Sequence, residues 1–242
     1  MSTDTILDLV EQFCNAEQLV DGHAALRSAL RNHGLDHVAY AAINLPAPKN
    51  QGPLIAVTYA IEWQQHYLRA GYVNIDPIVQ TAMGGVLPVD WGSIGRSDQV
   101  TKRFFGEAQE FGIGSDGLSF PVRGQHGEFA LFSVTSALPH VEWQKLKKEY
   151  ARDFMILAYY FHSWAMKKHA PLNSSIVANL SVREKDCLRW RAMGKSDWEI
   201  SQILAISERT VKFHLECART KLGAVNTTHA VASAISRGLM AF

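Results

Sequence analysis

Residues 180–240 read LSVREKDCLRWRAMGKSDWEISQILAISERTVKFHLECARTKLGAVNTTHAVASAISRGLM, and this stretch carries the end signals of four short helices. S-x-x-E patterns begin at Ser181 and Ser196, and each predicts a capping box in which serine and glutamate side chains bond free N–H groups at a helix start. Gly194 and Gly223 lie where the first and third helices would close through a residue with positive φ. The stretch therefore predicts a compact all-α domain.

The third helix of this domain has an apolar face and a face that suits DNA. At the helical period, its apolar stripe consists of Val211, Leu215, Ala218 and Leu222. The opposite face combines Phe213 and Glu216 with cations, including Lys212. In a DNA major groove, lysine can donate to guanine, glutamate can accept from cytosine, and an apolar ring can touch the thymine methyl group. The four-residue turn before it, Ala205 to Glu208, has the length of a helix-turn-helix.

We therefore predict that this region contacts double-stranded DNA. The residues predicted to make contact are Lys195, Ser207, Arg209, Thr210, Lys212, Phe213, Glu216 and Lys221. Helix caps and an apolar stripe alone would also fit a small packed bundle that binds no DNA.

A specific residue pattern runs through the same segment. It consists of Glu184, Leu188, Gly194, Glu199, Ile200, Ile203, Leu204, Ser207, Thr210, Val211, Lys212, His214, Leu215, Lys221, Leu222 and Ala230. On this pattern the segment closely resembles the C-terminal DNA-binding domain of LuxR-type regulators. Because such domains act as symmetric pairs, the resemblance implies a homodimer on an inverted repeat with half-sites roughly 10 bp, or a multiple, apart. RNA polymerase is a further candidate partner.

Charge is distributed unevenly along the 242 residues. The net charge is only +1, but residues 171–242 hold ten Lys or Arg against six Asp or Glu, while residues 1–170 hold fourteen against seventeen. The basic excess thus lies with the predicted DNA-contacting helix. A net charge of +4 in that part is modest and would also suit an ordinary solvated surface.

The cysteines and the apolar runs bear on the cellular compartment. Cys14, Cys187 and Cys217 are odd in number and lack the spacing of a zinc site, which argues against a disulfide framework or a metal. No apolar run approaches the ~20 residues that cross a bilayer, and the start MSTDTILDLV lacks the features of a signal peptide. We expect a soluble, cytoplasmic protein without a membrane partner.

The first two thirds of the chain alternate between helix and strand signals. Helices are expected over 5–20, between Asp21 and Gly34, and over 62–70, 97–111 and 140–168, and strands over 37–45, 54–59, 117–122 and 128–135. This order predicts an α+β protein: an N-terminal α-β-α sandwich with a mainly antiparallel sheet, followed by the all-α four-helix helix-turn-helix domain. The expected domains are 1–169 and 180–242, joined by a linker over 170–179.

Aromatic residues with polar tips concentrate around the third helix of the first domain. Tyr59, Trp63 and Tyr67 are spaced by four, so they share one side. Such a stripe fits either plain core or a pocket for a polar ligand, because buried indole and phenol groups need hydrogen-bond partners. Asp76 before Pro77 is similarly open: it fits a helix cap followed by proline at the first helical position, or a binding residue.

Six residues in a fixed order decide between these interpretations. They are Trp63, Tyr67, Asp76, Pro77, Trp91 and Gly117. In order and separation they match the signature of the LuxR-type autoinducer-binding domain, and the resemblance implies an N-acyl-homoserine lactone ligand. With the C-terminal match it covers nearly the whole chain.

The resemblance also implies a role for each pocket residue. Trp63 would donate to the lactone carbonyl, Asp76 would accept the amide N–H, and Tyr59 would bond the acyl carbonyl. Tyr67 would pack along the chain near the amide, and Trp91 would cover the lactone ring. A neutral ligand with one amide donor and two carbonyl acceptors needs one carboxylate and a few N–H or O–H donors on an apolar wall, and these groups are present.

The strand expected over 128–135 bears on the acyl group of the ligand. Ser133 stands where the family often has Ser or Thr near the amide end, and Phe129 would share its face because side chains alternate along a strand. A phenylalanine there would shorten or flatten the tail space. We therefore expect a short, branched or aromatic acyl group.

Other functions have weaker support. The G-x-G-x-x-G of Gly112 to Gly117 follows a helix and leads into a strand, which is the reverse of a dinucleotide-binding fold, and no H-E-x-x-H or G-x-S-x-G is present. We expect neither an enzyme nor a cofactor beyond the small-molecule autoinducer. A phosphorylation-controlled receiver would need alternating βαβ units. The stronger alternative is an orphan LuxR-type receptor for a non-lactone metabolite.

Overall fold

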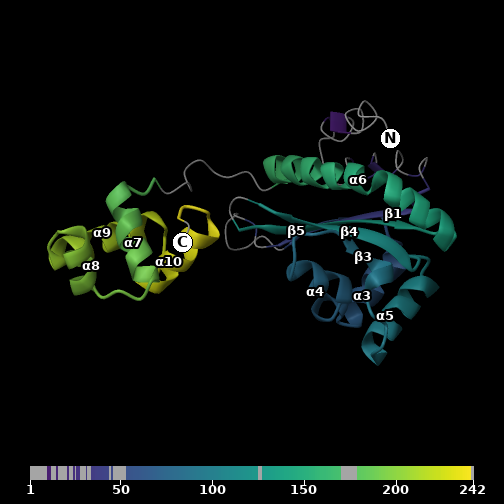
Figure 1. Cartoon of the computed structure of the whole chain (residues 1–242), viewed down its shortest axis with the longest axis horizontal. Helices are drawn as coiled ribbons and strands as arrows, with labels where there is room; N and C mark the ends of the chain where they lie inside the picture. The colour runs from purple at the N-terminus through teal and green to yellow at the C-terminus, as the bar shows by residue number, and fades with distance from the viewer. Residues whose placement is uncertain are drawn as a thin grey trace. The chain divides into compact units, whose positions relative to one another are not determined.

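Figure 1 shows the computed structural model of the 242-residue chain. It describes residues 53–124, 127–169 and 179–240 without a break, and before them 34–43 and the single positions 10, 11, 15, 21, 24, 26, 27, 31 and 45. The chain divides into two compact units. The first contains a five-stranded sheet with its covering helices, and the second contains the helices after residue 180.

The first unit is built on a sheet whose neighbouring strands are all antiparallel. The strands are β1 (His37–Ile43), β2 (Leu54–Val57), β3 (Val89–Asp90), β4 (Asp116–Arg123) and β5 (Phe129–Ser136). Their order across the sheet is β2-β1-β5-β4-β3. The central strand β5 therefore has a hydrogen-bonded neighbour on each side.

Helices cover both faces of this sheet (Figure 1). The longest, α6 (His140–His169), lies on one face and contacts β4 and β5. The other face carries α3 (Ile61–Arg69), α4 (Pro77–Met83) and α5 (Gln99–Glu110) with the 3-10 turns η1 (Tyr72–Asn74) and η2 (Trp91–Ser93). The predicted α+β class is confirmed. Not even α6 is long and apolar enough to cross a membrane, and the same holds for every other helix in the described part of the chain.

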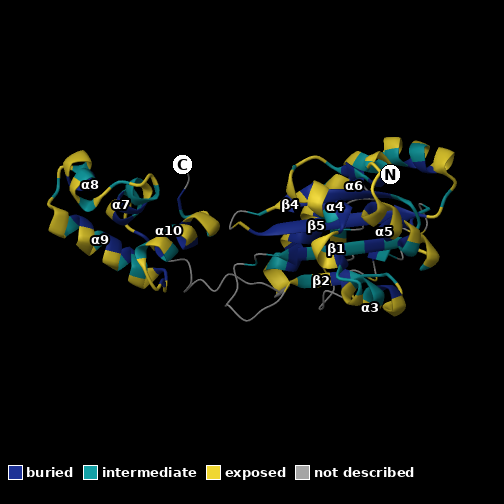
Figure 2. Cartoon of the chain, turned by 90° about the horizontal axis from the view of Figure 1, so that it is seen from below, coloured by how far each residue is buried: buried dark blue, intermediate teal, exposed yellow. Residues whose placement is uncertain are grey.

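Two-sided cover buries the central strand completely. Every residue of β5 is buried, although its sequence FALFSVTS mixes apolar and hydroxyl side chains. On the α6 side, the Phe132 ring packs on Phe161 with centroids 5.8 Å apart, and Tyr40 meets the same ring edge-on at 5.1 Å. Side chains of the other parity, such as Ser133, face the opposite layer. Figure 2 shows this burial as dark blue strands between the helices.

The predicted elements of the first unit agree with the structure except at their ends and where an element is very short. The strand expected over 54–59 ends at Val57, and the helix expected over 97–111 begins at Gln99 after its cap Asp98. We did not predict β3, because two residues show no periodicity, and only the Asp76 cap before Pro77 suggested α4, because seven residues show too little. The helices expected before Gly34, and the linker over 170–179, lie mostly outside the described residues.

The second unit confirms the predicted helix ends. Its helices are α7 (Val182–Ala192), α8 (Asp197–Leu204), α9 (Glu208–Lys221) and α10 (Thr227–Ser236). Ser181 and Ser196 both form complete capping boxes, and the Ser207 side chain caps α9. Gly194 and Gly223 adopt φ values of +80° and +64°. The turn between α8 and α9 comprises Ala205 to Ser207 and is one residue shorter than expected, because Glu208 is already helical.

A buried carboxylate joins the first and third helices of this unit. Glu184 is 5% exposed. One of its oxygens accepts the Ser181 backbone N–H at 2.8 Å, and both accept from the Lys221 ammonium at 2.8 and 2.9 Å. Burial by itself raises the pKa of Glu184, but the hydrogen bonds from Lys221 and from the Ser181 N–H outweigh burial and leave the pKa lowered. The predicted apolar stripe of α9 is also buried, with Val211 and Ala218 at 0% exposure.

Glu184→Ala should destabilise the second unit by about 1–3 kcal/mol, because it removes a buried, charge-assisted set of hydrogen bonds and one half of a capping box. Hydrogen exchange on the full chain measures this as faster exchange of α7 and α9 amides with unchanged exchange of β4 and β5. Asp186→Ala, on the same helix but only partly buried, is the matched control. Equal protection in both variants would contradict the proposed role of Glu184.

Candidate ligand cavity and DNA-contacting helix

A cavity of about 240 Å³ lies between the sheet and the helical layer that contains α3 and α4. Much of its wall is apolar, with Ala39, Ala41, Ile55, Val57, Leu68, Val73, Ile78, Val79, Phe104, Ala108, Ile113 and Leu131. The polar groups come from six of the seven residues that we predicted to bind ligand, Tyr59, Trp63, Tyr67, Asp76, Trp91 and Ser133, and from Gln64. The fold thus brings together side chains that are up to 74 positions apart in the sequence.

The two oxygens of the Asp76 carboxylate make different hydrogen bonds. Its Oδ1 accepts the backbone N–H groups of Ile78 at 2.8 Å and Val79 at 3.2 Å and so caps α4. Its Oδ2 accepts the Tyr67 hydroxyl at 2.8 Å. The side chain is therefore a helix cap and a cavity wall at once, and the two interpretations left open by the sequence are compatible.

Burial controls the protonation of the groups around Asp76. Burial raises the pKa of Asp76, and the hydrogen bonds from Tyr67 and from the Val79 and Ile78 N–H groups offset this only in part. The pKa of Tyr67 is raised by burial, then by the Asp76 charge and hydrogen bond. The pKa of Tyr59 is raised by burial and by the Asp76 charge. Both phenols therefore keep their protons near neutral pH and are available to donate, and Tyr67 donates to Asp76.

Trp63 is fixed by a shell of aromatic rings. Its ring centroid lies 5.5 Å from that of Phe111, 6.0 Å from Tyr67 and 6.1 Å from both Tyr72 and Phe104. Only 4% of Trp63 is exposed. This packing limits the orientations that the indole can adopt at the cavity wall.

Trp91 is positioned by a glycine and a serine on the neighbouring strand. A Cβ at Gly117 would lie 2.6 Å from Trp91 Cδ2, which is closer than van der Waals contact permits. The indole N–H donates to Ser119 Oγ at 2.8 Å. Packing against Trp91 therefore explains why glycine stands at position 117 of the signature. The Trp91 N–H is already used in a hydrogen bond within the protein.

Phe129 is the one predicted ligand contact that the cavity does not include. It is buried at the first position of β5, next to Arg123 on β4, whose guanidinium lies 5.1 Å from the centre of its ring. Arg123 also donates to the carbonyls of Met83 and Gly85 at the end of α4. Phe129 shares a strand face with Ser133, but β5 extends beyond the cavity, so a ligand contact at Phe129 stays a prediction that this cavity does not support.

Sequence patterns did not reveal a polar cluster behind the cavity. Glu107 accepts from His66 Nε2 at 2.5 Å, from Arg103 Nε at 2.6 Å and from the Tyr72 hydroxyl. These hydrogen bonds, that from Tyr72 having the largest effect, lower the pKa of Glu107 to about 2. His66 in turn stacks on Phe111, with centroids 5.1 Å apart. The spacing of Arg103 and Glu107 was the only available signal, since His66 is 41 positions away.

The outward face of α9 carries the side chains predicted to read DNA. Arg209, Lys212, Phe213 and Glu216 are exposed, and 62% of the Phe213 surface meets solvent. Glu216 forms an ion pair with Arg219, whose hydrogen bonds lower the pKa of Glu216. Cationic, apolar and anionic groups thus share one accessible helix face.

The other residues predicted to contact DNA already have bonding partners within the second unit. Ser207 accepts the Thr210 backbone N–H at 3.1 Å, and their hydroxyls are 2.8 Å apart. Lys195 pairs with Glu199 at 3.0 Å. Lys221 bonds Glu184, as described above. For these four residues, as for the four exposed ones on α9, a contact with DNA remains a prediction.

Two family models together match most of the chain. The model described as "Autoinducer binding domain" matches residues 19–165, and the model described as "Bacterial regulatory proteins, luxR family" matches residues 178–234. The chain belongs to the LuxR family. It has the autoinducer-binding and DNA-binding domains of these quorum-sensing transcription regulators.

Individual LuxR-family proteins are similar over much of the chain. The transcriptional activator protein RaiR of Rhizobium etli is 35% identical over 207 residues, which cover 86% of this chain and 85% of RaiR. The crystal structure of Escherichia coli SdiA has a TM-score of 0.69 at 20% identity and covers 99% of both chains. CepR2 of Burkholderia cenocepacia, described as N-acylhomoserine lactone dependent, has a TM-score of 0.55 at 18% identity and covers 68% of this chain and 95% of its own.

The Glu107 cluster of this LuxR-family chain predicts a pH dependence. The pKa of Glu107 is about 2 in the folded state, against an ordinary value of 4.5. Ionised Glu107 therefore stabilises the fold at pH values above its unfolded pKa, and this stabilisation is lost as the pH falls toward the folded pKa. Urea unfolding of Glu107→Gln should therefore show a flatter decline of the unfolding free energy between about pH 5 and pH 3 than the unsubstituted protein shows. Glu110→Gln, exposed on the same helix, should match the unsubstituted protein. Parallel curves for all three proteins would rule out this contribution.

Proposed function

We propose that the first domain, residues 1–169, binds an N-acyl-homoserine lactone, and that the ligand controls how the second domain, residues 180–242, occupies an inverted-repeat promoter site as a homodimer. The linker would span residues 170–179. The observation that carries this proposal is the hydrogen-bonding inventory of the cavity.

That inventory is one acceptor and a few donors on an apolar wall. Asp76 supplies the carboxylate, and Tyr59, Trp63 and Ser133 supply O–H or N–H groups. An acyl-homoserine lactone offers the complement: one amide N–H and two carbonyl oxygens on an otherwise apolar molecule. Burying these ligand groups is favourable only if each one finds a partner.

The position of each group supports the roles implied by family resemblance. Asp76 would accept the amide N–H through Oδ2, beside the bond from Tyr67. Trp63 would donate to the lactone carbonyl and Tyr59 to the acyl carbonyl. Tyr67 would pack along the chain near the amide, and Trp91, whose N–H is already bonded, would contribute its ring surface to cover the lactone.

The cavity volume supports a short or compact acyl group. At about 240 Å³ the space is smaller than the roughly 300–1,000 Å³ of pockets for drug-sized ligands. Phe129 no longer contributes to this argument, because it lies outside the cavity. The exposed lining residues Ile55, Leu68 and Val73, at 54%, 68% and 56% exposure, mark the open side along which a longer tail would extend.

A non-lactone ligand is the second candidate. One solved structure with the same fold is described as SdiA in complex with octanoyl-rac-glycerol. A glycerol hydroxyl could donate to Asp76 as an amide N–H does, and the ester carbonyl could accept from Tyr59 or Trp63. Mass spectrometry of the molecule that co-purifies from producing cells would separate the two classes.

Binding without catalysis suits the groups in the cavity. Asp76 and Tyr67 bond each other, and the family consists of transcription regulators, so we propose no enzymatic activity. A ligand enclosed by the folded domain stabilises it by RT ln(1 + [L]/Kd), or about 2.7 kcal/mol at a hundredfold excess over Kd. Regulator abundance and DNA occupancy would then follow ligand concentration. RNA polymerase would be the partner at the promoter.

Asp76→Asn should weaken lactone binding by roughly tenfold to a hundredfold, which corresponds to losing a charge-assisted hydrogen bond. The amide can still cap α4 through its oxygen, so the ligand-free protein should fold. The measurement is the rise in melting temperature across a series of N-acyl-homoserine lactones of increasing acyl length. Asp98→Asn is the matched control, because Asp98 caps α5 through Thr101 N–H at 2.8 Å without lining the cavity. Unaltered lactone response in Asp76→Asn would refute the assigned role.

Lys212→Ala should cost about 1–3 kcal/mol of binding free energy at one operator position and relax base preference there. Binding is measured by gel shift, with and without lactone, on operators in which each base pair is changed in turn. Lys148→Ala removes the same charge from an exposed site on α6 and should leave base preference unaltered. A uniform loss across all operators would mean that Lys212 contacts phosphate.

A further inference from the structure

We propose that Ser119 is a positioning residue that fixes Ser133 as a hydrogen-bond donor toward the ligand, through a directed chain that runs from Trp91 to Ser119 to Ser133. This inference rests on the proposed lactone-binding function and deepens it. It assigns a role to a residue that does not itself line the cavity.

The direction of the chain is set at Trp91. An indole nitrogen can only donate a hydrogen bond, and Trp91 Nε1 lies 2.8 Å from Ser119 Oγ. Trp91 and Ser119 are 4% and 0% exposed. Ser119 must therefore act as the acceptor in this bond, with no water competing for it.

The second hydrogen bond of the chain joins Ser119 to Ser133 across two strands of the sheet, and its direction follows from the first. Ser119 on β4 and Ser133 on β5 are directly opposite in the antiparallel register, and their hydroxyl oxygens are 2.7 Å apart. If Ser119 donates to Ser133, the Trp91 and Ser119 hydrogens are both used, and the Ser133 hydrogen is the one that remains. The reverse orientation would leave the Ser119 hydrogen buried without an acceptor among its recorded contacts, and a buried donor without an acceptor is unfavourable.

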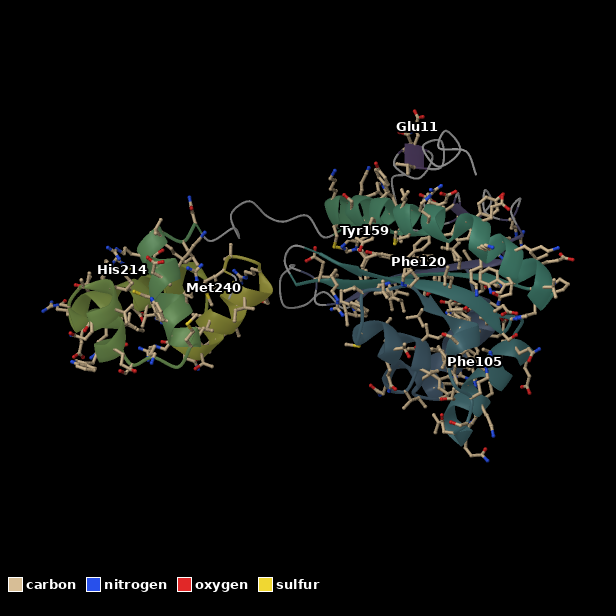
Figure 3. The ribbon with its side chains drawn as sticks, in the orientation of Figure 1. Glu11, Phe105, Phe120, Tyr159, His214 and Met240 are labelled. Carbon is tan, nitrogen blue, oxygen red and sulfur yellow. The ribbon has the colours of Figure 1, made fainter. Side chains whose placement is uncertain are left out.

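The sheet directs the end of the chain into the cavity. Phe120, the neighbour of Ser119, lies between the sheet and α6 (Figure 3), and its register partner Phe132 packs on Phe161 of that helix. Alternation along the strands places Ser119 and Ser133 on the other face, and Ser133 lines the cavity. With its oxygen accepting from Ser119, the Ser133 hydroxyl has its own hydrogen left to donate.

The consequence is a preference for one kind of ligand group. Ser133 would favour a ligand oxygen that accepts, such as the amide carbonyl, and would disfavour an N–H or O–H donor at the same place. The hydrogen-bond chain starts at Trp91, whose ring is expected to cover the lactone, and ends at Ser133, whose hydroxyl would meet the carbonyl. Ser119 bonds to both and so holds them in a fixed relation.

The test is a double-mutant cycle on the full chain. Calorimetry measures the Kd of N-hexanoyl-homoserine lactone for the unsubstituted protein, Ser119→Ala, Ser133→Ala and the double variant. We expect each single variant to weaken binding, Ser133→Ala by about tenfold, and the double variant to bind little more weakly than Ser133→Ala. Independent losses that multiply in the double variant would overturn the chain. Ser136→Ala, a buried serine that bonds Gly34 O at 2.6 Å on the same strand, should leave Kd unaltered.

A spectroscopic readout separates positioning from general packing. The infrared stretch of a ligand labelled with ¹³C at the amide carbonyl falls in frequency when the oxygen accepts a hydrogen bond. This band should move to higher frequency in Ser119→Ala and by a similar amount in Ser133→Ala, while Ser119→Thr, which keeps the hydroxyl, should leave the band in place. An unshifted band in Ser119→Ala would overturn the proposal.

Folding and ligand identity are controlled separately. If Ser119→Ala does not fold, the comparison of Ser119→Thr with Ser133→Ala decides, because a band shifted equally in both would contradict the role of the Ser119 hydroxyl. Failure of the unsubstituted protein to bind any acyl lactone would refute the proposed function and this inference with it. Binding by the unsubstituted protein with an additive cycle would refute the inference alone.

Discussion

A carboxylate held out of water organises the first unit. Asp76 is 7% exposed, and one of its oxygens caps α4 while the other accepts from Tyr67 on α3. Burial disfavours the charge, as the raised pKa shows, so a further donor from a ligand would relieve part of that cost. The same group thus links α3 and α4 at the cavity wall.

The second unit uses the same physical device for a different purpose. Glu184 closes a capping box at the start of α7 and accepts from Lys221 at the end of α9. Here the lowered pKa shows that the hydrogen bonds outweigh burial, so the carboxylate is satisfied without a ligand. The result is a fixed scaffold under the exposed face that carries Phe213, whereas the cavity of the first unit still has donors to satisfy.

The helix caps, the apolar stripe of α9 and the positions of β1, β2, β4 and β5 along the chain could be predicted because they depend on residues close in sequence. Ser181 and Ser196 form the caps that their spacing predicted, and the stripe around Val211 is buried as its period required. Six of the seven polar residues that line the cavity could also be named, because of the resemblance to a known family. The strand β3 was missed, and α4 was suggested only by its cap at Asp76, because each is too short to show a period.

Local periodicity and motif spacing were enough to predict the two-unit organisation, the α+β class, the LuxR-family membership and the residue types available for binding. The folded structure was needed to show which side chains share a site. It excluded Phe129 from the cavity, gathered His66 and Glu107 from separate helices, and placed Ser119 behind Ser133. These outcomes depend on where strands stop, on their register and on contacts between distant segments, and no local pattern encodes them.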